Sequence, residues 1–69
     1  MTYLEPRKFY DQAIIPKTDP QDWKVRYSYS ILIDILTRKL GSEVDAVDYF
    51  SLLIEPFIIL NGLIIDYNQ

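Results

Sequence analysis

Residues 28–50, SYSILIDILTRKLGSEVDAVDYF, decide the fold because they contain the start and stop signals of one helix and the start signal of the next. Ser28 is a good N-cap, since its hydroxyl can accept a backbone N–H of the first helical turn. Gly41 is suited to the left-handed conformation that ends many helices. The sequence therefore predicts a helix over 28–40. Its apolar residues recur at helical spacing and form one stripe: Tyr29, Leu32, Ile33, Leu36 and Leu40.

A second helix is predicted to begin at Ser42. Ser42 and Asp45 fit the [ST]-x-x-[DE] capping pattern, and the acidic first turns suit the helix dipole. Pro56 is expected to end this helix. Because the connection between the helices is so short, we expect them to pack as an αα-hairpin. The apolar stripe of the second helix is Ala46, Val47, Phe50, Leu53 and Ile54.

Two short strands are expected before the first helix. Residues 13–15 are apolar and end at Pro16, which cannot donate to a sheet ladder. Residues 24–27 alternate between charged and apolar side chains, as in a half-buried strand. The proline-containing stretch 16–22 predicts a loop, and the two strands are expected to pair in the antiparallel sense.

The apolar run 57–66 contains Asn61-Gly62, the strongest short signal for a β-hairpin. A buried helical segment is the alternative, because periodicity cannot distinguish the two in an all-apolar run. With the hairpin, the fold class is α+β: a small antiparallel sheet of three or four short strands covered by a two-helix hairpin. The chain, 1–69, is expected to form a single small domain.

Composition excludes several functional classes. There is no cysteine and no histidine, so disulfides, a thiol nucleophile, Cys/His zinc sites and a histidine acid–base are all ruled out. The net charge is −3 and the pI about 4.6, which disfavours nucleic-acid binding. We therefore expect no enzymatic activity, cofactor, metal or small-molecule substrate. The apolar runs near the C-terminus are too short for a membrane span, and a cytoplasmic protein is expected.

Several short segments of the chain follow a recurring pattern: Tyr3–Arg7, Tyr10–Ile15, Tyr27–Tyr29, Ile31–Leu36 and Asp45–Phe50. In these segments the chain resembles the widespread small uncharacterised proteins that tailed phages and prophages encode. This resemblance implies a miniature α+β fold and a phage setting in a host cell, but it implies no activity. Such proteins usually have a polar residue where Ile31 stands and a more polar C-terminal tail.

An excess of apolar residues points to protein binding. Ile31 and Ile35 lie outside the inward stripe of the first helix, so we expect them to form an exposed patch unless they meet the second helix. The predicted binding residues are Ile31, Ile35, Trp23, Ile58 and Ile64. The expected function is non-enzymatic protein binding, either as a homodimer or to a host or phage protein. Inhibition of a host enzyme or defence complex is one form that this binding would take. The alternative is a structural or assembly subunit without inhibitory effect.

Overall fold

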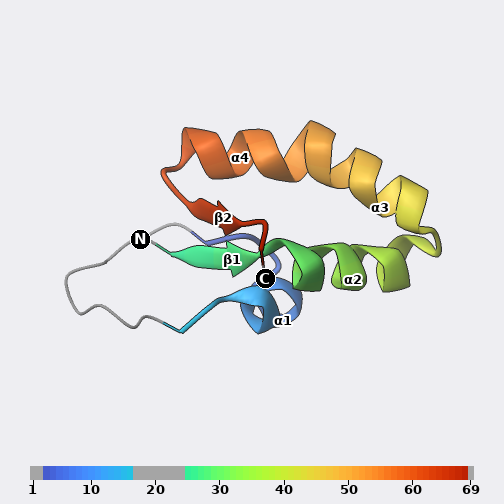
Figure 1. The fold of residues 1–69 in the computed structure, drawn as a ribbon, viewed down its shortest axis with the longest axis horizontal. Coiled ribbons are helices and arrows are strands. Elements are labelled where there is room, and N and C mark those ends of the chain that lie inside the picture. Colours follow the sequence, from blue (N-terminus) through green and yellow to red (C-terminus); the bar gives the residue numbers. More distant parts are fainter. Residues whose placement is uncertain (1–2, 17–24, 69) are drawn as a thin grey trace.

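A helical hairpin forms the body of the molecule, and the two strands of a small parallel sheet lie side by side at the end of the hairpin away from the α2–α3 turn (Figure 1). The computed structural model describes residues 3–16 and 25–68. The elements are α1 (Arg7–Tyr10), η1 (Asp11–Ala13), β1 (Arg26–Ser28), α2 (Tyr29–Leu40), α3 (Glu43–Tyr49), η2 (Phe50–Ile54), α4 (Glu55–Leu60) and β2 (Ile64–Asp66).

Helix α2 confirms the prediction for 28–40. The Ser28 hydroxyl accepts a hydrogen bond from the Ile31 N–H at 3.4 Å, and Gly41 ends the helix with φ at 82°. Leu32, Ile33 and Leu36 are buried, whereas Leu40, the last residue of the helix, is 40% exposed. Helix α3 begins where predicted, with the Ser42 hydroxyl accepting the Asp45 N–H.

The prediction that Pro56 ends the second helix is wrong. Helices α3 and α4 are joined without a break by η2, a π-helical turn in which the Glu55 N–H donates to the Phe50 carbonyl. A proline in a regular helix collides with the carbonyl four residues earlier and supplies no N–H. The wider π turn just before Pro56 accommodates both effects, so the helix continues to Leu60.

The predicted hairpin at Asn61-Gly62 is also wrong, and the helical alternative holds as far as Leu60. Gly62 has φ at +70°, as a hairpin would require, but it follows the C-cap of α4. The Leu63 N–H donates to the Ile58 carbonyl at 3.0 Å, and the Gly62 N–H donates to Ile59 at 3.4 Å. These two bonds, together with the burial of Leu63 and Ile58, define a Schellman motif.

The predicted antiparallel sheet of three or four strands is not formed. In the described residues, β1 and β2 make a two-stranded parallel sheet with Tyr27 opposite Ile65. The direction follows from the connection, because α2 leads away from β1 and the α3–η2–α4 helix leads back. Within the part of the chain that the structure describes, the expected pairing of 13–15 with 24–27 is reduced to one antiparallel bridge, between Ile14 and Tyr27.

The core lies between the hairpin, the sheet and the N-terminal segment. Both long helices contribute to it, and so do α1 and η1, which pack beside α2. Its largest fully buried side chains include Tyr10, Tyr27 and Phe50. The N-terminal segment is therefore part of the fold, and it forms a wall of the site described next.

Candidate functional site

The most unusual surface is the outer side of the α3–η2–α4 helix. We call it the outer face and define it as Leu52, Leu53, Pro56, Ile59 and Leu60. Its four large aliphatic side chains are highly exposed: Leu52 73%, Leu53 58%, Ile59 73% and Leu60 85%. Figure 1 shows this helix along one edge of the molecule, with α2 and the sheet on its other side. The outer face therefore points away from the core.

The buried residues of this helix explain why the outer face is exposed. They recur at intervals of four, as Ala46, Phe50, Ile54 and Ile58. In a regular α-helix of 3.6 residues per turn such a stripe would drift around the axis by about 40° per step. The π turn at Phe50–Ile54 reduces that drift and keeps the four side chains on the core. The remaining aliphatic residues of the run are then directed outward.

The outer face carries no charge of its own. Glu55 is the only ionisable residue between 51 and 60, and it is half-buried. Its carboxylate accepts a hydrogen bond from the Tyr67 hydroxyl at 2.8 Å. Burial, together with this bond, raises the pKa of Tyr67. The Tyr67 ring contacts Tyr29 and Phe50, so Glu55 is tied to the C-terminal segment.

An open groove of about 730 Å³ adjoins the outer face at Leu53. One wall comes from the N-terminal segment and the other from the helix. Its floor and rims combine apolar side chains with one acid and one base. The lining residues are Tyr3, Leu4, Glu5, Arg7, Tyr49, Leu53, Ile54 and Phe57.

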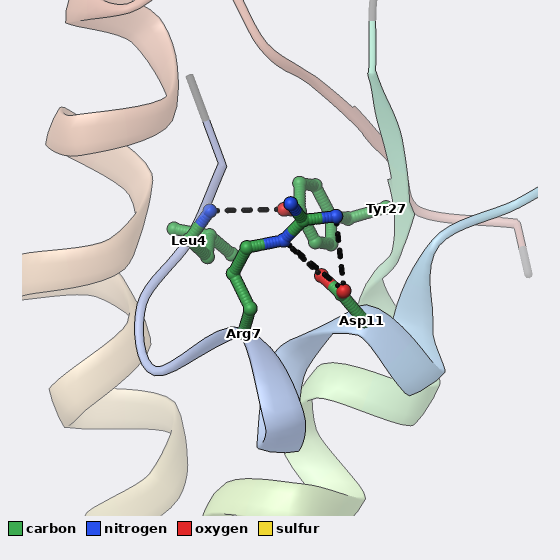
Figure 2. A network of polar contacts seen from close by, with 4 residues as sticks. All are labelled: Leu4, Arg7, Asp11 and Tyr27. Carbon is green, nitrogen blue, oxygen red and sulfur yellow. Dashed lines mark hydrogen bonds and ion pairs between the residues drawn. The ribbon is translucent and has the colours of Figure 1, made fainter. Parts of the chain in front are cut away.

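A network of polar contacts holds the N-terminal wall of this groove in place (Figure 2). The Leu4 N–H donates to the Tyr27 hydroxyl at 2.9 Å, in a buried bond between segments far apart in sequence. Arg7 pairs with Asp11 at 3.1 Å and stacks over the Tyr3 ring at 3.8 Å. Burial raises the pKa of Tyr27, although the hydrogen bond with Leu4 acts in the opposite direction. The groove is thus a preformed feature anchored to β1.

Ile31 and Ile35, predicted to bind a partner together, lie in different environments. Ile31 is 41% exposed, as expected. Ile35 is half-buried and packs against the core. It lines a hollow of about 330 Å³ with Phe9, Gln12, Arg38 and Lys39. The sequence argument assumed that nothing covers this side of the helix, but α1 and η1 pack there.

Two of the other predicted binding residues, Ile58 and Ile64, lie within the described part of the chain. Ile58 is only 3% exposed and belongs to the core, so it offers almost no surface to a partner in this conformation. Ile64 is half-buried in β2. Trp23 lies outside the described residues.

Sequence reasoning missed the outer face because it divided the helix at Pro56. Leu53 was assigned to the inward stripe, and Ile59 and Leu60 to a strand. A continuous helix would have placed Leu52 and Ile59, seven residues apart, on one side. The signal in the sequence was the four-residue spacing of Ala46, Phe50, Ile54 and Ile58, which crosses the proline.

Neither a metal-binding cluster nor a membrane-spanning helix is found in the part of the chain that the structure describes. Within residues 3–16 and 25–68, no cluster of three or more acidic, histidine or cysteine residues could hold a metal ion. None of the helices in that part of the chain has the length and apolar character needed to cross a bilayer.

Comparison with protein-family models, with curated proteins and with solved structures gives no match to this chain. The fold and the outer face are therefore interpreted on physical grounds.

Proposed function

We propose that this protein acts by binding another protein through its outer face, without catalysing a reaction. The observation that carries the proposal is the exposure of four large aliphatic side chains, at 58% or more, on one uncharged helix face. Together they expose on the order of 500 Å² of apolar surface, which is in the range of the largest patches on monomeric proteins. Patches of this kind mark interaction sites.

The free energy gained by burying the outer face is only moderately larger than the cost of association. Given the exposed fractions, burying these four side chains would contribute roughly 4–9 kcal/mol. Association itself costs about 4 kcal/mol or more. The outer face alone would therefore support only weak binding. The adjoining groove supplies what is missing, a preformed pocket for an anchoring side chain from the partner.

The setting we propose is the cytoplasm of a phage-infected or lysogenic cell, on the basis of the sequence resemblance. The partner is then a host protein, a phage protein or a second copy of the chain. With a host partner, inhibition of a host enzyme or defence complex is the expected consequence. The second candidate is a structural or assembly subunit. The lack of charge on the outer face favours this role as much as it favours inhibition.

A photo-crosslinking experiment tests the proposal. A benzophenone amino acid at position 59 should crosslink to a protein in the producing cells, and Leu52→Lys should abolish that crosslink. Val44→Lys is a matched control, because Val44 is 71% exposed on the same helix but lies outside the outer face. Loss with Leu52→Lys and retention with Val44→Lys, both variants being folded, supports the proposal.

Crosslinking that is equally strong in both variants, or absent at position 59, contradicts it. The nature of the crosslinked protein separates the two candidates. A host enzyme supports inhibition, whereas a component of purified phage particles supports the assembly role.

A further inference from the structure

We propose that the protein seated on the outer face is a second copy of this chain, paired antiparallel about a two-fold axis near Pro56. This inference rests on the function proposed above and specifies its partner. It is argued from the distribution of charge along the α3–η2–α4 helix and from the area that the outer face offers.

Apart from Glu55, which is half-buried and accepts a hydrogen bond from Tyr67, the charges of this helix lie at one end. Glu43, Asp45 and Asp48 lie in its first two turns, and the chain has no basic residue after Lys39. In a parallel pair these acids would lie beside their own copies, at the separation of about 8–10 Å between packed helices. No base on the helix would compensate them. A parallel arrangement is therefore disfavoured.

An antiparallel pair removes this repulsion. With Pro56 at the axis, the two acidic ends point in opposite directions and are about 30 Å apart, given a rise of 1.5 Å per residue. That distance is several times the Debye length of about 8 Å at physiological ionic strength. Each Asp48 would lie just beyond the Asn61-Gly62 turn of the other copy, which is uncharged.

The area is sufficient for a small homodimer. Two outer faces of on the order of 500 Å² each, together with the groove beside Leu53, reach the lower limit of about 1,000–1,200 Å² for specific interfaces. The face is also self-complementary in length. Leu52 and Leu60 lie about 12 Å apart along the helix, on either side of Pro56. In the antiparallel pair Leu52 of one copy faces Leu60 of the other.

This register allows a charge-swap experiment on the full chain. Leu52→Lys and Leu60→Glu should each weaken the dimer about tenfold or more, because each places two charges against leucine. Mixing the two variants should restore a heterodimer. In it, lysine at 52 faces glutamate at 60, while the second contact keeps both leucines. Val44→Lys is the control and should dimerise as the wild type does.

Sedimentation velocity over a concentration series measures the dimerisation of the wild type and of each variant. For the mixture, a fluorescently labelled Leu52→Lys variant is titrated with the Leu60→Glu variant. Circular dichroism checks that each variant is folded. A wild-type species of twice 8.2 kDa, two weakened variants and a restored mixture support the inference. Weakened variants without restoration overturn the antiparallel register, and unaffected dimers overturn the interface.

Failure of this inference can be distinguished from failure of the proposed function. A wild-type protein that stays monomeric, but loses its crosslink at position 59 through Leu52→Lys, overturns the homodimer and supports a different partner. If the outer-face variants keep both the dimer and the crosslink, both proposals are overturned.

Discussion

Replacing Gly62 with alanine should destabilise the protein by about 1 kcal/mol. A residue with a Cβ in the left-handed region costs roughly 1–2 kcal/mol, and Gly62 has φ at +70°. No atom lies within 4 Å of a Cβ built at this position, so steric collision adds nothing. Alanine also restricts the unfolded chain, which offsets about 0.4–1 kcal/mol of the loss. The remaining cost comes from the backbone conformation alone.

Urea unfolding followed by circular dichroism measures this effect. For a domain of this size, 1 kcal/mol corresponds to about 4–8 °C in the unfolding temperature. Gly41 is a matched comparison, because it has φ at 82° and equally open surroundings, so Gly41→Ala should cost a similar amount. Chemical synthesis with D-alanine at position 62, which prefers positive φ, should raise stability instead. An L-alanine variant as stable as the wild type would refute the Schellman conformation on which this reasoning depends.

Three further predictions follow from the described contacts. Burial raises the pKa of Tyr10 and Tyr27 above the usual 10, so the unfolded chain loses these protons first as pH rises. These two tyrosines should therefore lower the free energy of unfolding as pH rises above about 10, and Tyr10→Phe should reduce that slope. A profile that stays flat from about pH 10 to about pH 12 would contradict this. Ile35→Lys should lower the free energy of unfolding in urea by more than about 1 kcal/mol, because Ile35 packs against the core. The exposed Ile31→Lys should change it by about 0.5 kcal/mol or less. Equal effects would argue against the packing of α1 on α2. With a pI of about 4.6, the protein should show no micromolar binding to DNA or RNA by fluorescence anisotropy at physiological salt. Micromolar binding that weakens as the salt concentration rises would contradict this prediction.

The signals that did predict structure are local and chemically specific. Ser28 and Gly41 set the ends of α2 because a hydroxyl acceptor and a residue free to adopt positive φ satisfy the backbone groups left over there. Ser42 does the same for α3. In each case a few neighbouring residues determine the conformation, and no distant segment is needed.

The errors arose where distant segments determine the outcome. Gly62 adopts positive φ both in a hairpin and in a Schellman motif, so the dipeptide Asn61-Gly62 could not decide between them. The burial of Leu63 against Ile58 selects the Schellman motif. Similarly, the direction of β2 depends on how many helices separate it from β1. A continuous helix through Pro56 makes the pair parallel, whereas a break there would have left room for a hairpin.

The candidate binding site was missed for the same reason, and this connects the fold to the proposed function. Local rules require that a helix avoid an interior proline and that exposed helix positions be polar. The segment 50–60 breaks both rules, with a π turn before Pro56 and four exposed aliphatic side chains around it. Violations of local rules are expected where function, rather than folding, selects the residues. The core stripe through Ile54 and Ile58 would be satisfied equally well by polar residues at 52, 53, 59 and 60. These leucines and isoleucine therefore contribute little to the folded monomer, and this is the physical ground on which we propose a binding partner for them.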